Sequence, residues 1–550
     1  MRSKFIPYIY SFFLLINSYG LTSQEYKLKL TSTEEIEKSV LKKIDFHKKH
    51  KDSTKILDEI QKISDYLKNN GYFTNTIDSV TKKRKTITAF FSLGFKINKA
   101  TLNINKELEI YFDEYKINRH SVTIPIKSLQ TKLLGISKKL DSEGKSFSKI
   151  QLENISIKNN ILFADLHINE SKKRKINKVV IKGYEEFPRS FLKNYFDLND
   201  KTIFNQPKIK NVSSLSKGLE FAKEIKPPEV LFTKDSTFLY LYLKKQQNNS
   251  FDGIVNFTSK ENGGILFNGN IDLKLHNILN TGEKFNLFWN SIGEERQEFK
   301  LSTEIPYILN SKISPEISFS IYKQDSTFLN TKFDSKLFYN INPKIKLGVT
   351  YNSETSKNLE TTIANNIETF NNYFIGLQFL YRIPKNDVFF NHHFFLEVNP
   401  TLGQRKTNSD TTNQFKIDAT ISYIWDLNQR SNFYIKNKTG YLSSDSLINN
   451  ELFRIGGVES IRGYNEQSIF TSSYSYFNLE YRYLTSSKTY LYSITDFGTA
   501  KLTSKQKNLL GLGFGYSFFS KNSRINIGYV LNEEFSFTDS KIIFSMRMFF

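Results

Sequence analysis

The chain has 550 residues, no cysteine and a formal net charge of +22. The absence of cysteine excludes thiolate catalysis and cysteine metal sites. It is also typical of an exported protein that avoids stray disulfides. The basic excess lies in residues 24–250, with 44 Lys and Arg against 27 Asp and Glu, but these charges are scattered, so we expect no nucleic-acid partner.

Residues 1–23 have the layout of a secretory signal peptide. Arg2 and Lys4 precede an apolar run from Phe5 to Ile16, and small or polar residues follow around Gly20. The run is too short to serve as a membrane span with its flanks. No later apolar run is long enough for a helical membrane span. Because a signal peptide directs export, we expect the mature chain to begin outside the cytoplasm.

Residues 24–247 alternate strand-like and helix-like runs, and the pattern predicts three α+β modules at 24–94, 95–172 and 173–247. The elements predicted for the first module are a strand at 26–30, helices at 33–46 and about 56–69, and strands at 74–80 and 86–91. The second module is less regular, with a strand at 122–126, a helix at 128–140 and strands at 153–157 and 161–168.

The third module is the clearest. Its predicted elements are a strand at 176–181, helices at 188–196 and 206–221, and strands at 230–233 and 238–243. This order, strand, helix, helix, strand, strand, resembles the POTRA module of outer-membrane assembly factors. The resemblance implies that exposed strand edges accept extended client chains by β-augmentation. The alternative is an α+β repeat without a binding role.

From residue 248 onward the chain reads as strands alone, separated by Asn, Gly, Ser and Asp. Sixteen alternating runs predict a closed, antiparallel barrel that crosses an outer membrane. A soluble propeller or sandwich could also supply many strands, but the alternation argues against it. The predicted strands are 251–260, 264–278, 281–292, 295–307, 312–323, 326–340, 342–354, 370–384, 393–404, 412–427, 430–445, 472–486, 489–500, 508–519, 523–533 and 539–550.

Two late strands show most clearly which face meets lipid. Phe477, Leu479, Tyr481 and Tyr483 alternate with Asn478, Glu480 and Arg482, and Leu510, Leu512 and Phe514 alternate with Gly511, Gly513 and Gly515. A face of glycines opposite an apolar face predicts a bulky object close inside the barrel.

The C-terminal strand places Phe544, Met546, Met548 and Phe550 on one face, with Ser545 and Arg547 on the other. A last strand that ends in Phe resembles the C-terminal signal by which outer-membrane barrels are recognised for insertion.

The segment F-R-I-G-G-V-E-S-I-R-G-Y, residues 453–464, connects the eleventh and twelfth predicted strands. Its Arg462 can grip carboxylates bidentately, while Gly463 lets backbone approach backbone. Glu480 and Asp496, on the next two strands, are the candidate partners. An ordinary solvated arginine is the alternative.

Gly456, Gly457 and the stretch Ile461, Arg462, Gly463 and Tyr464 resemble the BamA/TamA superfamily of outer-membrane assembly factors, also called the bacterial surface antigen family. Its motif is a (V/I)-R-G-(F/Y) loop that enters the barrel lumen. The resemblance implies a salt bridge from Arg462 to Glu480 and Asp496. Three modules and a short barrel resemble the TamA branch more than BamA.

The resemblance implies an outer-membrane factor with periplasmic modules that capture unfolded polypeptides and a barrel that inserts them. The expected partners are unfolded outer-membrane or secreted polypeptides, outer-membrane lipid, and accessory proteins of the periplasm or inner membrane. The alternatives are a two-partner-secretion transporter and a passive porin or receptor barrel.

We find no nucleophile, acid/base constellation or phosphate loop, so we expect neither enzymatic activity nor a cofactor. His392 and His393 are adjacent and could suggest a metal, but a strand-end pair accounts for them, and we expect no metal site.

Overall fold

The structure is a computed structural model. It describes residues 25–550 except 247, 260–264, 293–295, 361–365, 386, 388, 503–504 and 537, so the predicted signal peptide at 1–23 lies outside the described residues. The chain divides into two compact units, Met1–Arg174 and Lys175–Phe550. Within the described part, no helix combines the length and apolar character needed to cross a membrane.

The first module of the first unit packs two helices on one sheet, with strand order β2-β1-β4-β3. Its core is formed by residues such as Leu28, Ile60 and Phe91. The elements are β1 (Tyr26–Thr31), α2 (Glu35–Leu41), β2 (Lys49–His50), α3 (Ser53–Asn69), β3 (Thr76–Lys83) and β4 (Thr86–Ser92). The helix predicted at 33–46 ends at Leu41, because the following chain extends toward β2 and buries Ile44 in this core.

The second module has a five-stranded sheet, ordered β6-β7-β5-β9-β8. A 3₁₀ turn and a short hairpin stand where the first module has its first helix, which explains the irregular sequence pattern. The elements are β5 (Lys99–Asn103), η1 (Lys106–Tyr111), β6 (Ile117–Asn118), β7 (Ser121–Pro125), α4 (Ile126–Ser142), β8 (Lys149–Lys158) and β9 (Ile161–Asn169).

The third module belongs to the second unit and has the sheet order β10-β12-β11. The elements are β10 (Lys178–Lys182), α5 (Arg189–Asn194), α6 (Gln206–Lys217), β11 (Ala222–Phe232) and β12 (Thr237–Lys245). The helix predicted at 206–221 ends at Lys217, where Gly218 follows. Phe221 instead packs into the module core, and β11 begins earlier than the predicted Val230.

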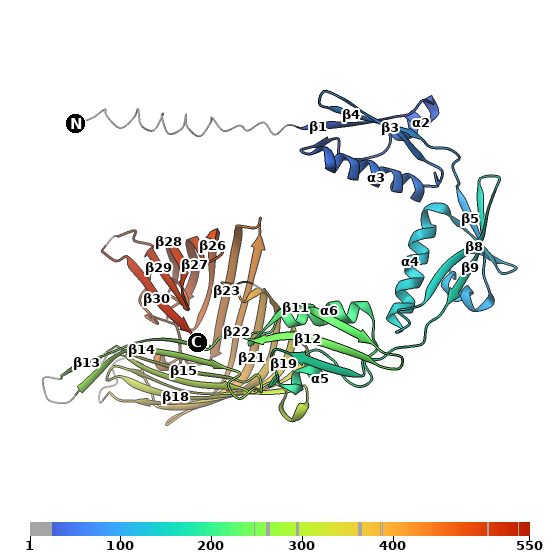
Figure 1. Ribbon diagram of the computed structural model, residues 1–550. Helices are drawn as coiled ribbons and strands as arrows, with labels where there is room; N and C mark the ends of the chain where they lie inside the picture. The colour runs from blue at the N-terminus through green and yellow to red at the C-terminus, as the bar shows by residue number, and fades with distance from the viewer. Residues whose placement is uncertain are drawn as a thin grey trace, which may run out of the picture. The chain divides into compact units, whose positions relative to one another are not determined.

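The described residues after the third module form a closed barrel of sixteen antiparallel strands, so the predicted fold class is confirmed (Figure 1). The strands are β13 (Ser250–Ser259), β14 (Ile265–His276), β15 (Lys284–Ile292), β16 (Arg296–Glu304), β17 (Ile313–Gln324), β18 (Phe328–Asn342), β19 (Ile345–Asn358), β20 (Phe370–Pro384), β21 (His392–Thr407), β22 (Thr411–Asp426), β23 (Ser431–Ser444), β26 (Ser473–Ser486), β27 (Thr489–Lys501), β28 (Gln506–Ser520), β29 (Ser523–Leu531) and β30 (Lys541–Phe549).

The barrel closes at a short seam between its first and last strands. Among the described residues, β13 pairs with β30 through Ser250–Phe549 and Phe251–Met548. On its other edge, β13 pairs with β14 along its whole length, from Ser250–Lys274 to Ser259–Ile265. In the part of the two strands that the structure describes, the rest of the facing edges of β13 and β30 is therefore not joined by ladder pairs.

The third module is held against the turns at one end of the barrel, here called the module end; the opposite end is the loop end. Asn277 donates a 2.6 Å hydrogen bond to the Tyr184 hydroxyl. The Phe191 ring meets Tyr307 edge to face, with centroids 4.9 Å apart. A Cβ added at Gly282 would lie 2.3 Å from the Phe191 ring, so this close packing requires a glycine there.

A polar contact completes the docking. Glu220, in the segment between α6 and β11, pairs with Lys284 at 2.6 Å and Arg382 at 3.1 Å. Burial by itself raises the pKa of the Glu220 carboxyl, but the positive charges of Lys284 and Arg382 outweigh burial and hold this pKa well below its usual range.

Candidate functional site

The strand faces of the barrel are set by strict alternation along β26 and β27. Phe477 and Tyr481 are exposed on the outer surface, whereas Asn478, Glu480 and Arg482 are buried. On β27, Leu491 and Phe497 face outward, while Tyr492 and Asp496 are buried. The polar residues therefore point into the lumen, as the sequence pattern predicts.

The connection between β23 and β26 folds into this lumen. Its two ends pair as a small hairpin, β24 (Phe453–Ile455) with β25 (Ile469–Thr471), after a 3₁₀ turn η3 (Asn449–Glu451). Gly456 and Gly457 have φ values of 110° and 92°, which disfavour any other residue. A Cβ at Gly457 would lie 1.8 Å from the Glu466 carboxylate, so the paired glycines allow this tight turn.

Arg462 is the centre of the folded connection. Its Nε donates to Asp496 Oδ2 at 2.8 Å, its Nη2 to Asp496 Oδ1 at 2.7 Å, and its Nη1 to Glu480 Oε1 at 2.6 Å. The Arg462 backbone N–H adds a 2.9 Å bond to Asp496 Oδ2. The side chains of Arg462, Glu480 and Asp496 are 10 %, 9 % and 0 % exposed. The structure thus brings the three residues together in a water-poor site.

Glu480 is shared with a second arginine. Arg482 Nε donates to Glu480 Oε2 at 2.7 Å, so both carboxylate oxygens are occupied. Two guanidinium groups and two carboxylates make a network of zero formal charge. Such compensation is what allows charged groups to remain buried.

The other motif residues fix the loop around Arg462. Ile461 is fully buried in a cluster with Ile455 and Tyr476. The Tyr464 hydroxyl accepts a 3.1 Å hydrogen bond from the Leu510 backbone. Gly463 has a φ of 99° and passes β29 closely, near the Leu531 carbonyl.

The glycine face of β28 meets the loop at one of its three positions. A Cβ at Gly511 would lie 2.1 Å from the Arg462 carbonyl oxygen. The predicted bulky neighbour is therefore present at Gly511. At Gly515 the space is filled by the Tyr492 ring instead, and Gly513 lies against the backbone of β29.

A second buried ion pair, which the sequence did not reveal, anchors the start of the connection. The Arg405 guanidinium on β21 donates to Glu451 of η3, and it also donates to the Ser446 carbonyl at 3.0 Å. Gln414 donates to the other Glu451 oxygen at 2.8 Å. The predicted strand at 393–404 ended one residue before Arg405, and no motif connects it to Glu451.

The connection also reaches the opposite wall. Gln467 donates a 2.8 Å hydrogen bond to Glu298 on β16, and the Arg454 guanidinium lies 3.6 Å from the centre of the Tyr322 ring on β17. In the closed strand order, β16 is eight strands away from β26. The connection therefore crosses the lumen and obstructs it near the loop end.

A second segment obstructs the lumen at the module end. Phe389 and Phe390, in the turn between β20 and β21, are both buried. The Phe389 ring lies 4.7 Å from Tyr490 and 5.2 Å from Phe519, whose side chains face inward. Arg524 of β29 donates to the Phe389 carbonyl at 3.2 Å. This turn thus reaches from the β20–β21 wall to β27, β28 and β29.

Arg482 touches both obstructions. It pairs with Glu480, which binds Arg462, and its guanidinium carbon lies 4.3 Å from the centre of the Phe390 ring. It also lies 4.0 Å from the Tyr434 ring centre. A displacement of the Arg462 loop therefore changes the surroundings of a side chain that packs on the module-end turn.

The residues predicted as a C-terminal signal lie at the seam. Phe544, Met546 and Met548 face outward from β30 and are exposed, and Phe550 follows the end of the strand. Their role in insertion stays a prediction. His392 and His393 begin β21, where His392 stacks on Phe395. Among the described residues, no group of three or more His, Asp or Glu could hold a metal ion.

Comparisons with known proteins agree with this architecture. Residues 317–518, which include Arg462, Glu480 and Asp496, match the model of the family described as haemolysin secretion/activation protein ShlB/FhaC/HecB. CdiB from Acinetobacter baumannii is 14 % identical over 90 % of this chain and 97 % of that chain, with a TM-score of 0.52. CdiB from Escherichia coli is 13 % identical over 90 % and 97 %, with a TM-score of 0.51.

BamA from Haemophilus ducreyi lacking POTRA domains 1–3 is 12 % identical over 77 % of this chain and 93 % of that chain, with a TM-score of 0.45. No curated protein sequence is significantly similar to this chain. The likeness to the two CdiB structures is one of fold, and a sixteen-stranded barrel of this kind lies in the outer membrane with its POTRA-like modules in the periplasm. The module end of the barrel faces the periplasm, and the loop end faces the outside of the cell.

The similarity to the ShlB/FhaC/HecB family covers residues 317–518, which are part of the barrel. A place in the TamA branch stays a prediction.

Proposed function

We propose that this protein is an outer-membrane assembly factor, which takes unfolded polypeptides from the periplasm and inserts them into or across the outer membrane. The observation that carries this proposal is the seam. β13 and β30 pair through two residue pairs among the described residues, so few ladder hydrogen bonds must break before the edges are free. Free strand edges template the pairing of a client strand.

The state of the lumen supports the same route. The Arg462 loop and the Phe389–Phe390 turn obstruct it at opposite ends. A client that must reach lipid meets less resistance at the weakly paired wall than along this obstructed channel. The buried ion pairs would then hold the Arg462 loop in place while the wall between β13 and β30 opens.

The periplasmic modules offer surfaces for client capture. β3 is an edge strand of its sheet, and all eight of its residues are exposed. Its free backbone groups can pair with an extended polypeptide, as expected for β-augmentation. Capture would depend on backbone atoms, and it would require neither catalysis nor a cofactor. The free energy would come from client folding.

The second candidate is a two-partner-secretion transporter, favoured by the match of residues 317–518 to the ShlB/FhaC/HecB family. In that case the client would pass through the lumen after both obstructions move aside. The contact of Arg482 with Glu480 and Phe390 would then couple the two movements.

A reversible staple across the seam separates the candidates. Phe251→Cys with Met548→Cys joins two register partners on the outer surface, in a chain that has no other cysteine. We expect oxidation to block insertion of an unfolded barrel protein into liposomes that contain the variant, and reduction to restore it.

The matched control is Tyr529→Cys with Ile542→Cys, a pair on the outer face across the regular β29–β30 junction. Oxidation of this pair should leave insertion unchanged. Full insertion with an oxidised seam would overturn the proposal. If a secreted polypeptide still crosses the stapled barrel while insertion never occurs, the transporter is the correct assignment.

A further inference from the structure

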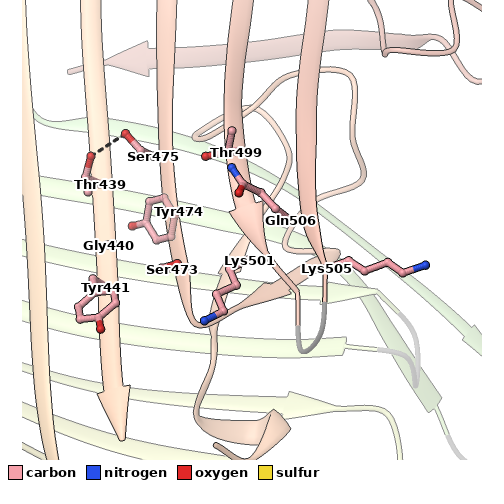
Figure 2. A pocket seen from close by; sticks show the side chains of 10 residues that line it. All are labelled: Thr439, Gly440, Tyr441, Ser473, Tyr474, Ser475, Thr499, Lys501, Lys505 and Gln506. Atoms are coloured by element: carbon pink, nitrogen blue, oxygen red, sulfur yellow. Dashed lines mark hydrogen bonds between the residues drawn. The ribbon is translucent and has the colours of Figure 1, made fainter.

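The outer wall of the barrel has a polar hollow near the loop end, with a volume of about 400 Å³ (Figure 2). It lies across β23, β26 and β27 and the start of β28. The residues that line it are Thr439, Gly440, Tyr441, Ser473, Tyr474, Ser475, Thr499, Lys501, Lys505 and Gln506.

The hollow follows from side-chain size. Ser473 and Ser475 are the outward residues at the start of β26, and they pair with Tyr441 and Thr439 of β23 on one side and with Lys501 and Thr499 of β27 on the other. Two short side chains between longer ones leave a trough. Its floor is polar, because the Thr439 and Ser475 hydroxyls lie 2.9 Å apart and share a hydrogen bond, as Figure 2 shows.

The trough lies directly beyond the apolar surface of the barrel. The next outward residues toward the module end are Phe477 on β26 and Phe497 on β27, whose stacked rings are 5.3 Å apart. On β23 the residue opposite Phe477 is Asn437, which donates a 3.2 Å hydrogen bond to the Ser475 hydroxyl, and the exposed Ile435 follows one outward position further on. Aromatic residues at this position mark the border between hydrocarbon and headgroups. The trough is therefore at the level of the outer-leaflet headgroups.

The trough carries a positive charge without a protein counter-charge. Lys501 is exposed, and it forms no ion pair within the described part of the chain. In Figure 2 its ammonium group extends beside Ser473, whereas the Lys505 ammonium group points away. One cation, several hydroxyl groups and an aromatic border fit a phosphate group attached to a lipid.

We propose that this trough binds the phosphorylated headgroup of an outer-leaflet lipid, with Lys501 contacting the phosphate, the serine and threonine hydroxyls donating hydrogen bonds, and Phe477 and Phe497 contacting the acyl chains. The site lies on β23, β26 and β27, of which β26 and β27 carry the carboxylates that bind Arg462, and it is separate from the seam. Bound lipid would therefore support the wall to which the loop is anchored.

The test uses the full chain in detergent, with diphosphorylated lipid A as the probe and native mass spectrometry as the readout. We expect one retained lipid that is lost when both phosphates are removed from the probe. Lys501→Gln should weaken retention about fivefold, which is the usual contribution of one lysine at a lipid surface. Lys488→Gln removes an exposed lysine at the opposite end of the β26–β27 hairpin and should have no effect.

Ser475→Leu provides a second variant that keeps the charge and fills the trough, and it should also lose the lipid. Equal retention of the dephosphorylated probe would overturn the proposal, as would equal losses in Lys501→Gln and Lys488→Gln. Inorganic phosphate is the third arm. Displacement of the lipid by millimolar inorganic phosphate alone would identify a small-anion site and overturn the lipid assignment.

Discussion

Arg462 is held by geometry that lysine cannot reproduce. Its Nε and Nη2 form a parallel pair of bonds with both oxygens of Asp496, while Nη1 reaches Glu480. A guanidinium group presents donors in this fixed fork, whereas an ammonium group is a single point of charge. The same site also receives the Arg462 backbone N–H, so Asp496 holds both the side chain and the loop backbone.

We predict that Arg462→Ala lowers the free energy of unfolding by about 3–5 kcal/mol, because it leaves two buried carboxylates without their partner. Arg462→Lys should recover only part of this loss. The measurement is urea unfolding of the refolded barrel, combined in double-mutant cycles with Asp496→Asn and Glu480→Gln. The coupling should be larger for Asp496, and coupling near zero with both carboxylates would disprove the lock.

Two glycines provide opposite expectations for the same substitution. Gly511→Ala places a methyl group about 2.1 Å from the Arg462 carbonyl, so the loop or the strand must shift. Gly135 in α4 has no neighbour within 4 Å of an added Cβ. We predict that Gly511→Ala destabilises the barrel, while Gly135→Ala stabilises its module by about 0.5–1 kcal/mol through helix propensity. Thermal unfolding of each variant is the measurement, and equal shifts would contradict both arguments.

The sequence could predict the Arg462 partners because two local signals agree. The alternation on β26 and β27 places Glu480 and Asp496 on the inner face. The motif around Arg462 predicts an arginine inside the barrel, which requires carboxylate partners. Arg405 and Glu451 had no such support. Arg405 and Glu451 meet only because η3 enters the closed barrel beside β21. The residues next to either of them in the sequence do not indicate this position.

At the scale of elements, all sixteen barrel strands were predictable, because lipid outside and polar groups inside impose a period of two. Helix ends were predicted less well. α6 ends at Lys217 and not at Phe221, because Phe221 packs into the module core after the helix has ended. The turn between β20 and β21 reads as an ordinary connection, because the partners of Phe389 and Phe390 lie about 100 residues away or more.

We predict that this turn and the Arg462 loop restrict ion flow together. Phe389→Ala with Phe390→Ala should raise the conductance of the barrel in planar bilayers, because both rings are buried in the lumen. Arg462→Ala should raise it separately, and the combined variant should give the largest conductance. Leu279→Ala, at an exposed position of another module-end turn, is the control. If the aromatic variant conducts like the control, the turn does not obstruct the channel.

At the scale of the whole molecule, the third module is part of the barrel unit. Tyr184, Phe191 and Glu220 each contact a barrel turn or strand end. The sequence could not show that the third module belongs to the barrel unit, because all three modules were predicted from a similar pattern of strands and helices. The boundary between the two units falls between Arg174 and Lys175. The contact requires Gly282 beside Phe191 and basic residues at the ends of β15 and β20, and these features are recognisable only once the barrel has closed.

The docking contact makes a prediction about pH. The pKa of Glu220 lies well below its ordinary value of 4.5 in the folded protein, because the opposing effect of burial is outweighed by Lys284, Arg382 and His276. A carboxyl whose pKa is lower in the folded than in the unfolded state contributes its full stabilisation at any pH above its ordinary, unfolded-state pKa. This contribution decreases as the pH falls below 4.5 and vanishes once the folded carboxyl is protonated.

We therefore expect Glu220→Gln to lower the melting temperature of the barrel unit at neutral pH, where the carboxylate is fully charged beside Lys284 and Arg382. The difference from the unchanged protein should shrink as the pH falls below 4.5. Glu229→Gln, at an exposed hairpin position of the same module, is the matched control and should leave docking intact. A difference for Glu220→Gln that stays constant down to strongly acidic pH would contradict this prediction, because a protonated Glu220 no longer attracts Lys284 and Arg382 as an anion.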